Sequence, residues 1–203
     1  MRNWGRYRFS RAAVGFVVVG FVQCFPGSSA RTQTTNERDL VARHALLLTK
    51  ALTYDSRILS RAGASMTLAV LFNPREATSK QEAEIWHERF AALQSLRFLG
   101  LPFSVIRVPF GSPADTRSFL REKGVDALMV CGGLDKELPI IVKITRNLKI
   151  ISIASHPDQV ARGLSMGVAI ERGKNSLLFN LRATREEGAL FTSDILKLAK
   201  VIK

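Results

Sequence analysis

Cysteine is scarce in this chain, and its scarcity excludes a disulfide framework. The 203 residues contain only Cys24 and Cys131. Cys24 lies in an N-terminal segment that we expect to be removed, so Cys131 is left alone and cannot close an internal disulfide or build a thiolate metal site. Cys131 ends the apolar run ALMVC. We therefore expect a buried thiol, with an intermolecular bond as the alternative.

Histidine is also rare, and this weakens the case for an enzyme. The three histidines are His44, His87 and His156, and no two of them have the spacing of metal ligands on a helix. Residues 163–167 match G-x-S-x-G, the nucleophile elbow of hydrolases. That elbow requires a strand before the serine and a histidine after it, whereas here a helical turn is predicted before it and every histidine precedes it. We predict a protein without catalytic residues, metal or cofactor.

Acidic residues are outnumbered by basic ones. The chain has 17 Asp and Glu against 30 Lys and Arg, a formal net charge of +13. The basic residues are spread along the chain rather than gathered in one block. Such a surface is compatible with anionic lipid headgroups, an acidic partner or nucleic acid. The export that the N-terminus predicts makes nucleic acid the least favoured of the three, and a basic domain without an anionic partner remains the simplest interpretation.

The N-terminus has the pattern of a secretory signal peptide. Residues 1–11 carry four arginines and no acid, and residues 12–22 form an unbroken apolar run. Small residues follow, which predicts a signal peptide over 1–30 with cleavage near Ala30. The run is shorter than the ~20 apolar residues of a membrane-spanning helix. A periplasmic protein is therefore predicted, with an N-terminal membrane anchor facing the periplasm as the alternative.

The remainder predicts a single α/β domain over 38–203, after a flexible tail at 31–37. A helix is expected over 36–61. Four apolar runs then alternate with helical segments, a pattern typical of parallel strands buried on both faces. The runs are 66–72, 103–108, 126–130 and 150–154. The predicted fold is a three-layer α/β/α sandwich of about four parallel strands.

The last forty residues change in character. SMGVAIE and SLLFNL are separated by a short segment containing Gly173, which predicts a C-terminal antiparallel hairpin at one edge of the sheet. Two short helices are expected after it. In the final one the apolar side chains at helical spacing, Ile195, Leu198, Ala199 and Ile202, are expected to face the core.

Two glycines after the third strand are the candidate ligand-binding residues. Gly132 and Gly133 lie between a predicted strand and a predicted helix, where backbone N–H groups can bind an anion. They form neither a dinucleotide fingerprint nor a phosphate loop, so a tight turn is the alternative. Upstream, Ser79 and Glu82 have the spacing of a capping box at the start of a helix.

Both ends of the chain resemble the YfiR family of exported regulators paired with membrane-bound diguanylate cyclases. The resemblance covers about residues 38–203. It is carried by Lys50, Tyr54, Asp55, Arg61 and Gly63 near the start, and by Asn180, Leu181, Ala183, Gly188, Ser193 and the leucine-rich segment 195–199 at the end. Tyr54, Asp55, Gly63, Asn180, Gly188 and Ser193 are read as structural signature residues. The lone Cys131 departs from any redox switch in the family, and the first helix lacks an aromatic-rich sequence.

The resemblance implies a non-enzymatic periplasmic regulator. Such a protein would bind a membrane-bound cyclase or sensor kinase and repress it, and it would form a homodimer. The alternative is a small-ligand-binding domain similar to one lobe of a solute-binding protein, suggested by the Gly132–Gly133 turn at the strand ends.

Overall fold

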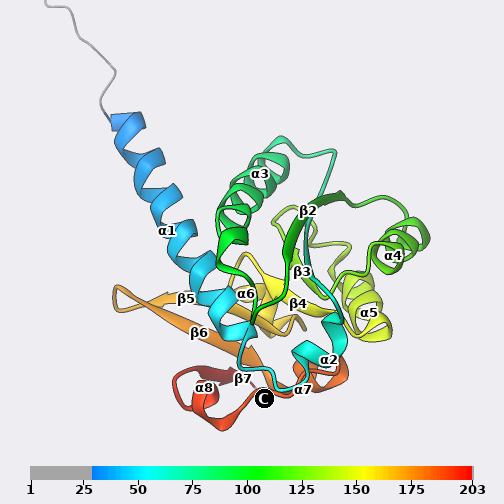
Figure 1. Cartoon of the computed structure of the whole chain (residues 1–203). Coiled ribbons are helices and arrows are strands. Elements are labelled where there is room, and N and C mark those ends of the chain that lie inside the picture. The colour runs from blue at the N-terminus through cyan, green and yellow to red at the C-terminus, as the bar shows by residue number, and fades with distance from the viewer. Residues whose placement is uncertain (1–28, 203) are drawn as a thin grey trace, which may run out of the picture.

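The computed structural model describes residues 29–202 of the chain as one sheet covered by helices (Figure 1). The predicted signal peptide lies outside the described residues, apart from its last two positions. Seven strands pair in the order β2-β1-β3-β4-β5-β6-β7. They are β1 (Met66–Phe72), β2 (Phe103–Pro109), β3 (Ala127–Val130), β4 (Ile151–Ala154), β5 (Met166–Glu171), β6 (Lys174–Asn180) and β7 (Lys200–Ile202). The first five run parallel, β6 is antiparallel to β5, and β7 is parallel to β6.

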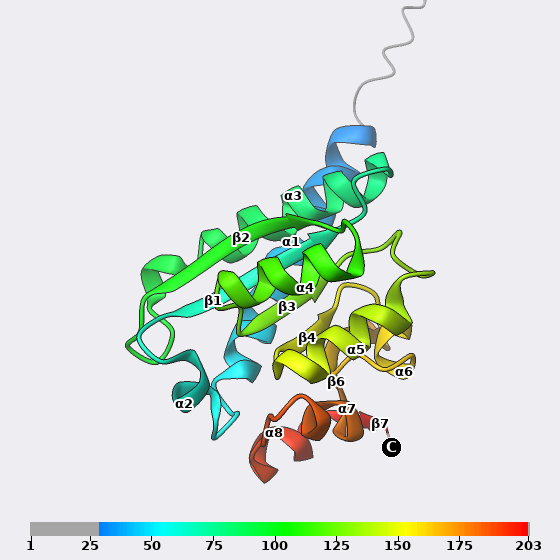
Figure 2. The ribbon, with the colours of Figure 1, turned by 90° about the vertical axis from the view of Figure 1, so that its right-hand side faces the viewer.

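Helices cover both faces of the sheet. The helices are α1 (Ser29–Leu52), α2 (Ile58–Ala62), α3 (Ala77–Ala91), α4 (Pro113–Glu122), α5 (Leu138–Leu148), α6 (Asp158–Ala161), α7 (Leu181–Glu186) and α8 (Ser193–Lys197), with a 3-10 turn η1 (Gln94–Leu96). Helices α1 and α3 lie side by side on one face (Figure 1). Helices α4 and α5 pack together on the other (Figure 2). The predicted three-layer α/β/α fold is confirmed.

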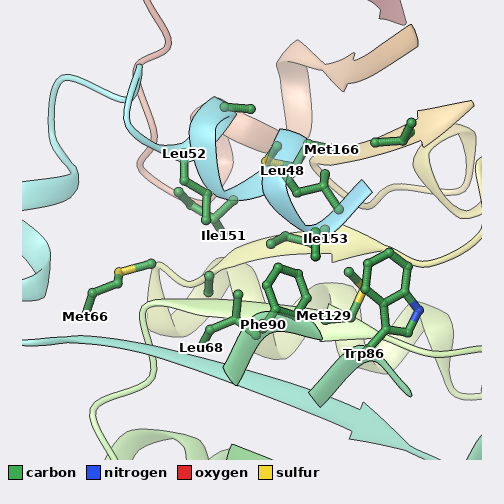
Figure 3. Close-up of a cluster of buried hydrophobic side chains, with 14 of the residues drawn as sticks. Leu48, Leu52, Met66, Leu68, Trp86, Phe90, Met129, Ile151, Ile153 and Met166 are labelled. Carbon is green, nitrogen blue, oxygen red and sulfur yellow. The ribbon is translucent and has the colours of Figure 1, made fainter. Parts of the chain in front are cut away.

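The core consists of two apolar layers, one on each face of the sheet. On the α1–α3 face, Leu48 and Leu52 from α1 and Phe90 from α3 pack onto the strands (Figure 3). All four residues of β3 and of β4 are buried, which is why these strands read as unbroken apolar runs. Each fully buried Leu or Phe contributes about 1.5–3 kcal/mol relative to an exposed one.

The N-terminal helix differs from the prediction at both ends. Helix α1 begins at Ser29, so residues 31–37, expected to be a flexible tail, are helical. It stops at Leu52 instead of continuing to 61, and a turn separates it from α2. The Asp55 carboxylate accepts the backbone N–H of Arg57 in this turn, at 3.1 Å. A short polar side chain that binds nearby backbone competes with the helical hydrogen bonds and ends the helix.

The C-terminus also differs. The last helix, α8, ends at Lys197, and the chain then forms β7 along the outer edge of β6. The hairpin is present as predicted, but β7 rather than β6 forms the sheet edge. Leu198 is 78% exposed, so the prediction that it faces the core is wrong, whereas Ile195 is buried. Pairing with the free edge of β6 outweighs the local helical pattern.

Candidate functional site

The carboxyl ends of β1, β3 and β4 meet at one edge of the sheet. Strand β1 lies between β2 and β3, so the chain moves outward to β2 and then crosses back to β3. Ligands of open α/β sheets bind where the strand order reverses in this way. The Gly132–Gly133 turn directly follows β3 at this point. The fold therefore places the two predicted ligand-binding glycines where a binding site is expected.

The glycine turn is held by three polar side chains. The Gly132 N–H donates to Glu82 Oε2 at 2.8 Å, and Ser79 Oγ donates to the Gly132 carbonyl at 2.7 Å. Asn73, at the end of β1, donates its amide to the Gly133 carbonyl at 2.8 Å. The polar groups that the turn offers at these positions are therefore used by the chain itself.

Ser79 and Glu82 do not form the predicted capping box. Helix α3 begins two residues before Ser79, and its N-cap residue, Glu76, makes no side-chain capping bond. Ser79 is buried and bridges the Asn73 N–H and the Gly132 carbonyl. The spacing of three residues puts both side chains on one face of α3. Here that face meets the turn after β3 rather than the start of its own helix.

Both glycines have a physical reason to lack a side chain. Gly133 has φ +75°, and a Cβ there would overlap the Glu76 carboxylate. A Cβ on Gly132 would lie 2.9 Å from His156 Nε2 and 3.1 Å from Glu82 Oε2. The turn therefore requires glycine for its conformation at one position and for close packing at the other.

A hollow of about 590 Å³ opens beside this turn. We call it the Glu82 hollow; it is lined by side chains of α1 and α3 and by the turns after β3 and β4, including Val41, His44, Glu82, Trp86, Gly132 and His156. Its size falls within the range of about 300–1,000 Å³ that is usual for small-molecule sites. Sequence reasoning missed Glu82 and both histidines as site residues, because α1, α3 and the β4 turn come together only by packing.

Glu82 and His156 form a weak ion pair in this hollow. His156 Nε2 lies 3.4 Å from Glu82 Oε1, and its side chain is 54% exposed. Burial raises the pKa of Glu82, but hydrogen bonds, chiefly those from His156 and the Gly132 N–H, lower it below its ordinary value. The hydrogen bond to Glu82 raises the pKa of His156 above its ordinary value. Burial lowers the pKa of His44 on the opposite wall.

Two further hollows show a different chemistry. One, of about 900 Å³, lies on the other side of Gly133 and mixes both charges, with Arg75 and Lys136 beside Glu76 and Asp135. The other, of about 450 Å³, lies at the opposite edge of the sheet, with basic side chains at the ends of α4 and α5. Cations in the last turns of helices complement the helix dipole, which explains this basic cluster without a ligand.

The turn at Tyr54 and Asp55 is hydrogen-bonded to Leu190 and Thr192 near the end of the chain, and we call this contact the Asp55 clamp. Asp55 is 2% exposed and accepts the Leu190 N–H at 2.7 Å and the Arg61 guanidinium at 2.6 Å. Tyr54 is exposed, and its carbonyl accepts the Thr192 N–H at 3.1 Å. The Asp55 side chain and the Tyr54 backbone carbonyl therefore join the turn after α1 to the segment between α7 and α8.

The other signature residues shape turns. Asn180 caps α7, because its Oδ1 accepts the Ala183 N–H at 3.0 Å. Gly63 and Gly188 have φ +61° and +83°, directly after α2 and just after α7. Ser193 is the first residue of α8. None of these four residues lines the Glu82 hollow.

Ser165, the serine of the G-x-S-x-G match, is buried and does not stand on a nucleophile elbow. Its hydroxyl donates to the Glu187 carboxylate, which also accepts Thr145 Oγ1 at 2.6 Å and the Ser152 N–H and hydroxyl at 2.7 and 2.6 Å. Burial raises the pKa of Glu187 despite these hydrogen bonds. Cys131 is buried, as predicted.

The described part of the chain offers neither a metal site nor a membrane-spanning helix. Residues 29–202 contain no group of three or more His, Cys, Asp or Glu placed to hold a metal ion. Within the same range, no helix combines the length and apolarity that crossing a bilayer requires.

Comparison with known proteins shows the fold alone. No protein-family model and no curated protein matches the sequence. A conserved domain protein from Vibrio cholerae is similar over 80% of this chain, with a TM-score of 0.57 and 16% identity. An ABC domain from Streptococcus pneumoniae, solved in complex with L-Trp, is similar over 75% of it, with a TM-score of 0.54 and 17% identity.

A ligand-free, open substrate-binding protein from Clostridium difficile is similar over 72% of the chain, with a TM-score of 0.51 and 16% identity. The similar region spans only 57 to 60% of the length of these three structures. The chain therefore has an α/β fold of the kind found in substrate-binding proteins.

Proposed function

We propose that this chain is an exported, non-enzymatic binding domain that holds a small molecule in the Glu82 hollow. The observation that carries the proposal is the Glu82 carboxylate. It lies at the reversal point of the sheet, in a hollow of ligand size, and the two hydrogen-bond partners that the described residues give Oε1 are both at 3.4 Å. The likeness to substrate-binding folds supports it, including one solved with L-Trp.

The described residues form one sheet, so the hollow opens on one side. Periplasmic binding proteins usually close two lobes around the ligand. The chain spans less than two thirds of the similar structures, which fits a single lobe. A homodimer, which the family resemblance implies, would supply a second surface, and it stays a prediction.

The test is ligand binding by the purified full chain. We expect at least one member of a panel of amino acids, amines and organic acids to raise the melting temperature and to bind saturably in calorimetry. Gly132→Ala would abolish the binding, because its Cβ would crowd His156 and Glu82. Gly111→Ala is the control, since its Cβ would meet no atom within 4 Å. Flat melting curves across the panel would contradict the proposal.

A second candidate function is regulation of a membrane-bound cyclase or sensor kinase by direct contact. It is supported by the resemblance at both chain ends and by exposed apolar side chains beside the Asp55 clamp. Tyr54 and Leu190 point outward there, because their neighbours Asp55 and Phe191 pair and are buried. Leu198 is exposed as well.

Substitutions in this exposed group separate the two candidates. Leu190→Asp and Leu198→Asp should leave the melting temperature unchanged, since both side chains are exposed. If the chain is a regulator, both variants should lose crosslinking to a cyclase or kinase in membranes. Crosslinking that persists in both would count against this surface.

A further inference from the structure

The Glu82 carboxylate gives the Glu82 hollow a negative charge of its own. The Gly132 N–H, which would otherwise be available to an anion, is taken by Glu82 Oε2 at 2.8 Å. An anionic ligand would therefore have to displace this carboxylate or approach it against its charge. Among the described residues that line the hollow there is no Lys or Arg to bind an anion. The hollow is consequently a poor site for a phosphate or carboxylate.

The second oxygen of the same carboxylate, Oε1, is the atom that can accept a hydrogen bond from a ligand. Trp86 Nε1 and His156 Nε2 both lie 3.4 Å from Oε1, at the outer limit for a hydrogen bond. A charge-assisted bond from an ammonium group is shorter, about 2.7–2.9 Å, and about twice as strong as a neutral one. His156 is half-exposed and can turn toward solvent.

We infer that the ligand of this hollow carries a protonated amine, and that this amine replaces His156 on Glu82. The inference rests on the proposed function and names the ligand class. The walls define the rest of the ligand. Val41, Ile85 and Trp86 line the hollow, so the amine is attached to an apolar body. Recognition thus joins one ionic contact with burial of apolar surface.

Replacement of His156 by an amine should release a proton, which can be measured. The charged and titratable groups near it are His44 on α1, Glu82 on α3, Asp158 on α6, and Asp135. The three acids raise the pKa of the imidazole, with the hydrogen bond to Glu82 as the largest cause. An imidazole that leaves Glu82 loses the largest of these causes, so its pKa falls and it releases its proton. Amine binding therefore tightens as the pH rises from the ordinary histidine pKa of about 6.5 through the raised pKa of His156, and it is constant above that until the amine itself deprotonates at about 10.

The ligand class is tested by calorimetry with matched pairs that share one apolar body. The pairs are tryptamine with indole-3-propionate, and isopentylamine with 4-methylpentanoate. The amines should bind at least about tenfold more tightly than the acids, as expected for a charge-assisted hydrogen bond. Glu82→Gln, which keeps an acceptor for the Gly132 N–H, should remove that preference. Glu84→Gln, on the exposed side of α3, should keep it.

The exchange with His156 is tested by proton release. Binding enthalpies at pH 7 in buffers of different ionisation enthalpy should show protons released by the wild type and none by His156→Asn. This variant should bind the amines at least as tightly, because the competing imidazole is gone. Circular dichroism melting confirms that each variant folds.

The outcomes separate this inference from the proposed function. Equal binding of amines by Glu82→Gln and the wild type would overturn the inference. Binding of the acids alone would also overturn it, but would leave a small-molecule site in place. If none of the four probes binds, the inference is overturned; the proposed function is overturned only if the wider panel of amino acids, amines and organic acids also gives flat melting curves.

Discussion

Glu82 and Glu187 are two carboxylates that each accept a backbone N–H at or next to a strand of the sheet. Their surroundings differ, and the difference separates a candidate ligand site from a purely structural hydrogen-bond network, which we call the Glu187 lock. Glu187 is completely buried near the start of β4, and its donors lie at 2.6–2.7 Å or closer. Glu82 reaches the end of β3, is partly exposed, and has one short contact and two long ones. Glu187 has no capacity left for a ligand, whereas Glu82 has one oxygen to spare.

The largest expected effect is the loss of the Glu187 lock. Glu187→Ala leaves buried donors of Ser152 and Ser165 without an acceptor, and each such group costs about 1–3 kcal/mol. We expect the free energy of unfolding, measured with urea, to fall by about 3–5 kcal/mol. Glu186→Ala is the control, since Glu186 pairs at the surface with Arg146 and Arg182 and should cost less than about 1 kcal/mol. Equal losses would remove the distinction.

A smaller effect is expected at the turn that Glu82 holds. Gly133→Ala forces a side chain into the left-handed region and against Glu76, at a cost of about 1–2 kcal/mol. Urea unfolding measures this loss in the free energy of unfolding. Gly111→Ala is the control, and its free energy of unfolding should lie within about 0.5 kcal/mol of the wild type. A neutral Gly133→Ala would show that the turn is not as tightly held as these contacts indicate.

Removal of the Glu82 carboxylate should cost less again. Glu82→Ala frees the Gly132 N–H, but the turn is partly exposed and water can replace the lost acceptor. We expect the free energy of unfolding to fall by about 1 kcal/mol. A loss as large as that of Glu187→Ala would mean that Glu82 is also a structural lock, and would weaken the proposed site.

The two carboxylates should also respond to pH in opposite directions. The pKa of Glu82 is lowered and that of His156 is raised. Their pair therefore stabilises the fold most between the ordinary values of about 4.5 and 6.5, and its contribution is lost as pH falls through the lowered pKa or rises through the raised one.

The raised pKa of Glu187 has the opposite sign, because ionisation is disfavoured in the folded state. Its contribution to stability falls as pH rises from the ordinary value of 4.5 through the raised one. Urea unfolding from pH 4 to 8 checks both. The wild type should have a larger free energy of unfolding than His156→Asn near pH 5–6, and this difference should shrink toward pH 8. As the pH rises above 4.5, the free energy of unfolding of the wild type should fall relative to that of Glu187→Gln. If the free energies of unfolding of the wild type and the variants changed in parallel with pH, the assigned directions of the pKa shifts would be contradicted.

The sheet was predictable from sequence because parallel strands are buried on both faces. Residues 66–72 therefore appear as an unbroken apolar run, and β1 has those bounds. Of the site, the Gly132–Gly133 turn was predictable from its place after a strand, but Glu82, His44 and His156 were not, because packing brings them together. Ser79 and Glu82 carry a valid local capping pattern, but the turn after β3 offers stronger partners in the folded protein. Similarly, Leu198 has helical spacing, and only the free edge of β6 explains why the chain leaves the helix.

The Asp55 clamp has a consequence for how the chain folds. Its bond to the Leu190 N–H joins residues 135 positions apart, and β7 forms still later in the chain. Contacts of such long range close late, because the entropy of a large loop must be lost before they form. The buried Asp55 is thus without its full set of donors until the C-terminal segment arrives. In a growing chain, Asp55 would therefore stay accessible to water until Leu190 has been synthesised and has folded back onto it.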